Sequence, residues 1–198
     1  MLAIFLDIET SGLDSYHHCV LEIAFKVLDI QTGEEVFTYQ SIIKHTKEVW
    51  EKRDPASVDF NGFTYEKMLL GQEQNLVSKE IIQIFTDLKI ERGKAVYICQ
   101  NPSFDRGFFS QVVDVYSQEK LNWPYHWLDF ASMHWVLQVK RCAEKHLPPP
   151  VEMNLSKNAI AQQFGLPAET EPHSALNGVD HLILCYRTVV GFGNYSNI

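Results

Sequence analysis

The fold is decided by the stretch Leu2-Ala3-Ile4-Phe5-Leu6-Asp7-Ile8-Glu9-Thr10-Ser11-Gly12-Leu13-Asp14. A short apolar run that ends in turn residues is typical of a buried strand. Because side chains alternate across a strand, Asp7 and Glu9 point to the same face. Two carboxylates side by side on a buried strand repel each other and are costly to desolvate, and a cation beside them removes both penalties. The pair therefore indicates a Mg²⁺ or Mn²⁺ site; the alternative is a strand end that dips its acids into solvent.

The length and composition indicate one domain. The chain has 198 residues, of which 45% are hydrophobic, enough for a sizeable core. We expect the domain to cover residues 1–190 and residues 191–198 to form a loose C-terminal tail. The four cysteines are widely spaced without a CxxC pair, which argues against zinc and fits reduced thiols in a cytoplasmic protein. We expect no membrane partner, because there is no leader pattern and no apolar run long enough to span a bilayer.

The charge balance limits how the protein could contact nucleic acid. Lysine and arginine total 17 against 25 acids, for a formal net charge of −8. This balance argues against a protein that coats long nucleic acid through a broad basic face. A grip on one end of a strand through bound metal ions stays compatible, because the ions supply the positive charge.

Apolar periodicity and turn residues predict an α/β chain. The first three strands resemble an antiparallel meander, and later strands feed into helices. Residues 47–61 are polar and irregular, with Pro55 as a breaker, and Ser78 is the expected N-cap of the first helix. The predicted strands are residues 2–10, 19–30, 36–43, 95–99 and 127–129. The predicted helices are residues 78–88, 102–116, about 130–145, 155–164 and 176–190.

Three further polar residues are candidates for chemistry. Asp105 follows a buried strand at the first turn of a helix, where it either complements the helix dipole or adds a third metal carboxylate. His173 lies in a loop, where histidines are usually solvated. Asp180 follows Leu176 by four residues and precedes Ile183 by three, at the edge of the expected inward stripe. A carboxylate there needs a partner, either a salt bridge or a metal.

These residues form three motifs in chain order. They are Asp7-Ile8-Glu9-Thr10 with Gly12-Leu13, then Asn101 with Phe104-Asp105 and Phe108, then His173-x-Ala175-Leu176 leading to an acid. Together they resemble the motifs of the DEDDh 3′→5′ exonucleases, which include proofreading subunits, ribonuclease T and oligoribonuclease. The resemblance spans nearly the whole chain. It implies a ribonuclease-H-like fold: a mixed five-stranded sheet, three antiparallel strands then parallel ones, with helices on both faces.

One position departs from the family pattern. The family usually places its last aspartate five residues after the histidine, and here that residue is Gly178. Asp180 could replace it, Asn177 could give a neutral ligand, or the ligand could be missing and the second ion weak. We take Asp180 as the ligand, because it alone brings charge and is expected to face inward.

The resemblance implies a metal-dependent 3′→5′ exonuclease that releases nucleoside 5′-monophosphates from single-stranded DNA or RNA. Two Mg²⁺ or Mn²⁺ ions would stabilise the attacking and leaving oxygens. The implied ligands are Asp7, Glu9, Asp105 and Asp180, and His173 would take a proton from the attacking water. The implied substrate-binding residues are Thr10, Gly12, Leu13, Asn101 and Phe108. Phe104 and Phe108 are both candidates for base stacking, and core packing is preferred for Phe104.

Two other functions remain open at this point. The displaced last acid also fits a catalytically weakened nucleic-acid-binding module of the same fold. The other alternative is an unrelated acidic α/β domain, which would require three ordered motif matches to be accidental. The sequence leaves open DNA against RNA preference, a homodimer, and a polymerase partner.

Overall fold

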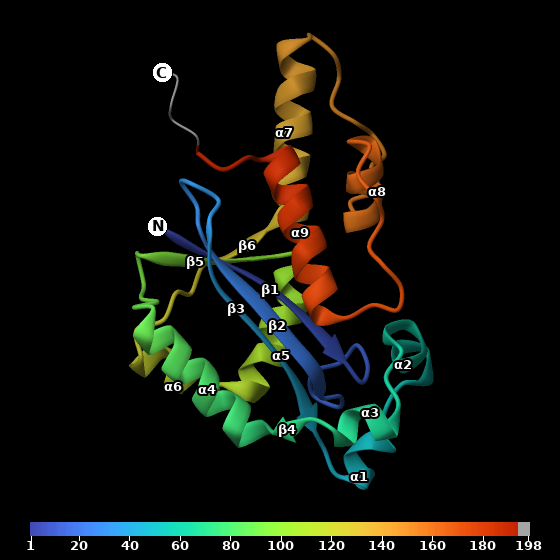
Figure 1. Ribbon diagram of the computed structural model, residues 1–198. Helices are drawn as coiled ribbons and strands as arrows, with labels where there is room; N and C mark the ends of the chain where they lie inside the picture. The colour runs from blue at the N-terminus through green and yellow to red at the C-terminus, as the bar shows by residue number, and fades with distance from the viewer. Residues whose placement is uncertain (194–198) are drawn as a thin grey trace.

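The computed structural model describes residues 1–193, and one sheet organises them. Its strand order is β4-β3-β2-β1-β5-β6 (Figure 1). Strands β1 to β3 are antiparallel, whereas β5 pairs in parallel with β1 and with β6. The strands are β1 (Leu2–Thr10), β2 (Val20–Asp29), β3 (Glu35–Lys44), β4 (Gln72–Glu73), β5 (Ala95–Cys99) and β6 (Trp127–Asp129). The ribonuclease-H-like α/β fold is thus confirmed, with six strands rather than five, because the two residues of β4 pair with the end of β3.

Helices cover both faces of the sheet. On one face lie α4 (Gln74–Asp87), α5 (Pro102–Val112) and α6 (Val115–Lys120); on the other lie α7 (Phe130–Glu144), α8 (Lys157–Gln163) and α9 (Ala175–Val189). The alternation along β1 divides its side chains between these two layers. Ile4, Leu6 and Ile8 join the core under α4 and α5, whereas Ala3 and Phe5 join the core under α9. Asp7 and Glu9 continue the second series, so the strand directs both acids to the α9 face.

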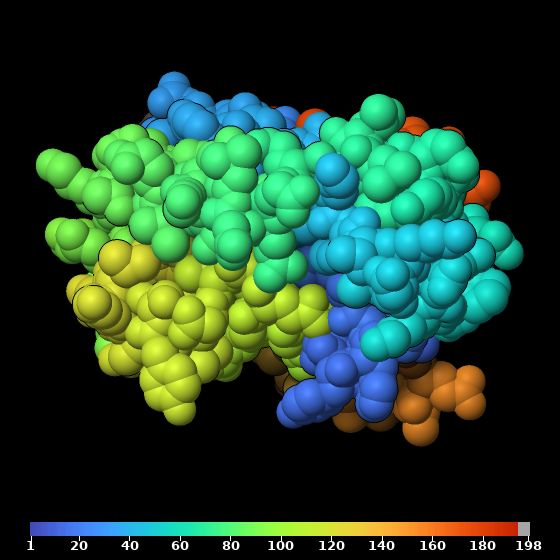
Figure 2. All heavy atoms as spheres, turned by 90° about the horizontal axis from the view of Figure 1, so that it is seen from below, coloured from blue at the N-terminus to red at the C-terminus, as the bar shows by residue number. Residues whose placement is uncertain are grey.

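A small helical layer closes the carboxyl end of β1. It contains α1 (Lys47–Trp50), α2 (Pro55–Asn61) and α3 (Tyr65–Leu69), which pack over a third apolar cluster. Our expectation of an irregular segment at residues 47–61 was wrong, because Asp54 caps Ala56 N, Pro55 starts α2 and left-handed Gly62 ends it. Seen from below, these helices (cyan) lie beside the loop after β1 (dark blue) (Figure 2). The backbone N–H of Asp54 donates to the carbonyl of Ser11 in that loop.

Two helix boundaries differ from the prediction for local reasons. Helix α4 begins at Gln74, so Ser78 lies inside the helix rather than at its N-cap. The helix expected over residues 102–116 is two helices, because Asp114 accepts hydrogen bonds from Tyr116 N and Ser117 N and so starts α6.

The end of the described chain packs against the sheet. Of the segment expected as a tail, residues 191–193 are described, and Phe192 lies edge-on to Phe5 with ring centroids 6.2 Å apart. The remaining five residues, 194–198, lie outside the described part of the chain. Within residues 1–193, no helix has the length and apolar character needed to cross a membrane.

Candidate active site

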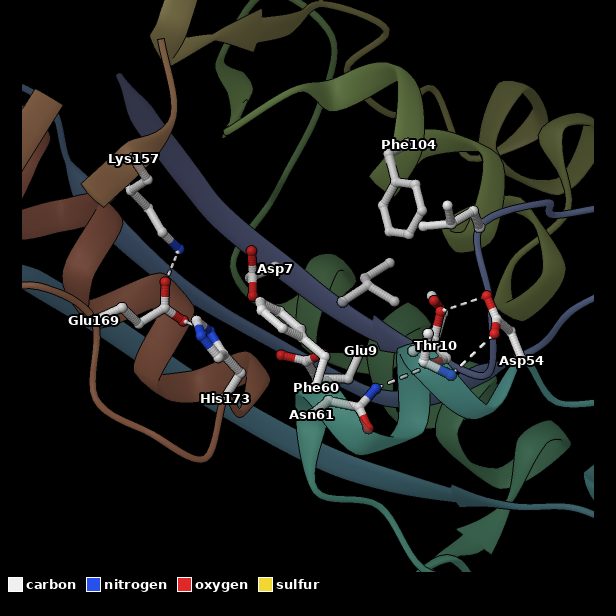
Figure 3. Close-up of a pocket in the computed structure, with 14 residues that line it drawn as sticks. Asp7, Glu9, Thr10, Asp54, Phe60, Asn61, Phe104, Lys157, Glu169 and His173 are labelled. Carbon is white, nitrogen blue, oxygen red and sulfur yellow. Dashed lines mark hydrogen bonds and ion pairs between the residues drawn. The ribbon is translucent and has the colours of Figure 1, made fainter. Parts of the chain in front are cut away.

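An open cavity of about 490 Å³ lies at the carboxyl end of β1 (Figure 3). It brings together β1, the loop after it, α2, the start of α5, α8 and the loop before α9. Most of its polar lining comes from acids and hydroxyls, with Lys157 and His173 as the basic side chains. The lining residues are Asp7, Ile8, Glu9, Thr10, Leu13, Asp54, Ala56, Ser57, Phe60, Asn61, Phe104, Lys157, Glu169 and His173.

Asp7 and Glu9 both line this cavity, from the same face of β1 (Figure 3). Burial raises the pKa of Asp7 to about 6, with Lys157 opposing the rise and Glu169 adding to it. Burial, followed by the negative charge of Asp7, raises the pKa of Glu9 to about 8. Glu22 of β2 is 2% exposed and adds to the repulsion, being paired with Glu9 across the two strands. The floor of the cavity therefore carries several carboxyl groups that repel one another when they are ionised.

Asp105 is buried near Asp7 and Glu9 and is not among the residues that line the cavity. It is in the first turn of α5, which Pro102 begins, and it is 3% exposed. Burial raises its pKa well above the usual range, and the charges of Asp7 and Glu9 raise it further. The three motif acids are thus near enough to disfavour one another's ionisation. Such a set fits a divalent cation chemically, because the cation removes that repulsion.

No ready metal cluster exists among residues 1–193. No group of three or more histidine, cysteine, aspartate and glutamate side chains there is gathered so that it could hold an ion. The fit of Asp7, Glu9 and Asp105 to a cation therefore rests on their donor chemistry and mutual repulsion.

A chain of polar contacts lines the side of the cavity nearest α9. The Lys157 ammonium lies 2.8 Å from Glu169 Oε2 and donates to the carbonyl of Gly178 at 3.1 Å. Burial alone would lower the pKa of Lys157, but the charges of Asp7 and Glu169 outweigh burial and raise it. Burial likewise acts to raise the pKa of Glu169, but Lys157 and His173 hold it below its usual value. Lys157 is thus a cation and Glu169 an anion.

His173 continues this chain. Its Nδ1 lies 3.1 Å from Glu169 Oε1, and its ring stacks on Phe60 of α2 with centroids 4.2 Å apart. An ionised carboxylate only accepts hydrogen bonds, so His173 Nδ1 is the donor in this contact. The Nε2 atom is then free to accept a proton.

The opposite side of the cavity comes from the loop after β1 and from α2. Thr10 Oγ1 donates to the carbonyl of Gly12 at 2.7 Å, which fixes the turn. Asn61 is buried and its Nδ2 donates to the carbonyl of Thr10 at 3.0 Å. Leu13 lines the cavity while 75% exposed, so an apolar side chain borders the opening.

The structure contradicts Asp180 as a ligand. Its carboxylate is about half exposed and lies 2.7 Å from Lys26 Nζ, outside the cavity. The buried residues of α9 are instead Ala175, Gly178, Val179, His181, Leu182, Cys185, Tyr186 and Val189. At 100° per residue, Asp180 is turned about 200° from Gly178 and so faces away. The rival Asn177 is exposed and lines a neighbouring hollow, which it shares with Asp180 and Glu169 but not with Asp7.

Three of the five expected substrate residues do not line the cavity: they are Gly12, Asn101 and Phe108. Gly12 lies in the turn after β1, where its carbonyl accepts from Thr10. Phe108 is 1% exposed within the core under α4 and α5, so it cannot stack on a base, whereas Phe104 lines the cavity. This reverses our preference between the two phenylalanines. Asn101 has a left-handed backbone (φ 59°) before α5, and its side chain accepts from Ser103 rather than lining the cavity.

Sequence reasoning missed the α2 wall and the Lys157–Glu169 pair. The Asp54-Pro55 cap signal could have revealed α2, and with it Phe60 and Asn61. Nothing local marks Lys157 or Glu169, because one begins a short helix and the other lies in the loop after it.

Comparison with known proteins identifies the fold. No protein-family model matches the chain, and no curated protein matches its sequence. Solved structures do match. Escherichia coli exonuclease I in complex with a dT13 oligonucleotide is 15% identical with a TM-score of 0.69, over 95% of this chain and 41% of that one. Exonuclease I from Methylocaldum szegediense is 17% identical with a TM-score of 0.69, over 94% of this chain and 40% of that one.

A third match is a 3′-exonuclease. It was solved in a study of 3′-end-specific recognition of a histone mRNA stem-loop. It is 13% identical with a TM-score of 0.66, over 97% of this chain and 65% of that one. The chain therefore spans well under half of the exonuclease I chains, and the likeness at this identity concerns the fold.

Proposed function

We propose that this protein is a metal-dependent 3′→5′ exonuclease that releases nucleoside 5′-monophosphates from single-stranded nucleic acid. The observation that carries the proposal is the joint placement of Asp7, Glu9 and His173 in one cavity at the end of β1. The three ordered motifs support it, as does the fold shared with exonuclease I and a 3′-exonuclease. Asp7, Glu9 and Asp105 would hold a Mg²⁺ or Mn²⁺ ion, which when bound would stabilise negative charge on the attacked phosphate.

The remaining chemistry belongs to the chain's own residues. His173 Nε2 takes a proton from the attacking water, while Glu169 and Phe60 keep the ring oriented. The water oxygen bonds to phosphorus, the bond from phosphorus to the 3′-oxygen of the preceding nucleotide breaks, and that oxygen takes a proton from solvent. The products are a nucleoside 5′-monophosphate and a strand shortened by one nucleotide.

The cavity walls suit a terminal nucleotide. Thr10 and Asn61 offer polar groups for the sugar, and the exposed Leu13 offers an apolar edge for the last base. Phe104 provides an aromatic face on the side of α5. A paired terminal base would have to be unstacked before it could enter, which favours single-stranded substrates.

The test is digestion of 5′-labelled single-stranded DNA and RNA of matched sequence with Mg²⁺ or Mn²⁺. We expect stepwise shortening from the 3′ end and release of nucleoside 5′-monophosphates, with a 3′-phosphate-blocked oligomer as the control. His173→Ala should reduce turnover by about 10²-fold or more. A protein that binds the oligomers but never cleaves them would instead be the non-catalytic binding module.

A further inference from the structure

At position 178, where an acid was expected from the family pattern, Asp7 takes up the space beside the glycine. Gly178 lies in the first turn of α9, directly against Asp7. A Cβ built on Gly178 would lie 2.6 Å from Asp7 Cγ and closer still to Asp7 Oδ2. No side chain can therefore be placed at 178 unless Asp7 moves. The absence of an acid at position 178 is therefore linked to the position of Asp7.

A cation already lies beside this position. The Lys157 side chain is 11% exposed, and its ammonium contacts the Gly178 carbonyl and Glu169 Oε2. Glu169 is itself 5% exposed, so the pair is buried in the cavity wall (Figure 3). Buried charges of this kind are costly unless paired, and here the two oxygens accept from two of the three ammonium N–H groups.

These contacts occupy oxygens that a second divalent ion would need. Such an ion needs oxygen donors near Asp7 on the α9 side. The oxygens on that side are already engaged: Glu169 Oε2 and the Gly178 carbonyl contact Lys157, and Glu169 Oε1 contacts His173. The buried Glu22 carboxylate accepts from Gln40 and from Ala175 N, and Asp180 contacts Lys26. The second ion of the expected pair does not fit this site.

We propose that the Lys157 ammonium takes the place of a second divalent ion, so that the protein uses one ion held by Asp7, Glu9 and Asp105. This inference rests on the proposed exonuclease function. The ammonium supplies one fixed positive charge on the α9 side of the phosphate, and Glu169 holds both Lys157 and His173 at that side. One carboxylate, that of Glu169, thereby positions both the ammonium that would stabilise the phosphate charge and the imidazole that would accept the proton.

The test counts bound ions in the full chain. Mn²⁺ binding is titrated by electron paramagnetic resonance of the free ion, and wild-type protein should bind one Mn²⁺. Lys157→Met frees Glu169 and the Gly178 carbonyl, so it should bind two. Lys79→Met, which changes an exposed lysine of α4, is the matched control and should bind one. Two ions on the wild type, or one ion on Lys157→Met, would overturn the inference.

A second pair of variants guards against misfolding. Lys157→Arg keeps the charge and should bind one ion. The double variant Lys157→Met with Glu169→Gln removes both buried charges; it should also bind one ion, and its turnover should be at least about tenfold below that of the single variant Glu169→Gln, which by itself disturbs His173. Turnover of the double variant equal to that of Glu169→Gln would contradict the role of Lys157. Failure of the proposed function looks different, because wild-type protein would then bind no Mn²⁺ and leave all oligomers uncleaved.

Discussion

The buried carboxyl of Glu9 lowers the stability of the folded protein by an amount that depends on pH. A carboxyl whose pKa is higher in the folded state than in the unfolded state adds stability at low pH, and that stability is lost as pH rises through the folded pKa. The pKa of Glu9 is raised from 4.5 to about 8 and that of Asp7 from 3.8 to about 6. The metal-free protein should therefore lose stability as pH rises from about 4 to about 8.

Glu9→Gln isolates this effect. In EDTA we expect its melting temperature to match the wild type near pH 5 and to exceed it by about 3 °C or more near pH 9. Calorimetry or circular dichroism measures the difference, with Glu66→Gln as a control at an exposed acid. Adding Mg²⁺ should raise the wild-type melting temperature most at the alkaline end. A difference that shrinks with pH would show that Glu9 is not destabilised by burial.

Helix α2 shapes the site through one buried amide. Asn61 donates to the Thr10 carbonyl and accepts from Phe63 N, tying the helix end to the carboxyl end of β1. Asn61→Ala leaves the Thr10 carbonyl without this partner, so we expect a loss of about 1–3 kcal/mol in unfolding free energy. Because Thr10 lines the cavity, KM for a short oligomer should rise as well.

Glu66→Gln, at an exposed acid of α3 in the same helical layer, is the control and should leave both quantities unchanged. Denaturant unfolding and steady-state kinetics provide the measurements. A stable Asn61→Ala variant with wild-type KM would mean that α2 does not position the site.

Helix α9 shows why a charged residue near a motif is not always part of it. Asp180 binds Lys26, which also lies 3.1 Å from Glu35, so the contact stabilises the surface between α9 and the sheet. Asp180→Asn should keep turnover within about twofold of the wild type and cost about 1 kcal/mol or less. Asn177→Ala should likewise keep turnover in the nuclease assay within about twofold of the wild type. A tenfold loss from Asp180→Asn would restore it as a ligand.

At the scale of the whole molecule, the charge distribution predicts weak salt dependence. The net charge is −8, and among residues 1–193 Lys157 is the one lysine or arginine that lines the cavity. Few phosphates can then be neutralised by side chains, so few counterions are released on binding. The slope of log K against log salt for single-stranded DNA should be shallower than about −2.

Fluorescence anisotropy with the cleavage-impaired His173→Ala variant and Mg²⁺ measures this slope. A basic-face binder such as one that coats long strands would give a much steeper slope. A steep slope here would therefore point to a phosphate-binding surface outside the cavity.

The sequence by itself determined the local features of the site. The apolar run around Asp7 and Glu9 dictated a buried strand, and its period of two placed both acids on one face. Pro102 and the preceding buried strand located Asp105 at a helix start, and the three motifs appeared in the right order. These are properties of neighbours along the chain, which propensity and alternation capture.

Only the tertiary structure decided what faces Asp7 from the other side of the cavity. The periodicity of α9 is readable from sequence, but Leu176 and Ile183 are only partly buried, so the stripe that they suggested was shifted. Gly178 meets Asp7, 171 positions distant, because α9 packs across β1. The Lys157–Glu169 pair joins a helix to a loop, and neither residue carries a local signal. Such contacts depend on how layers pack, which no stretch of neighbouring residues encodes.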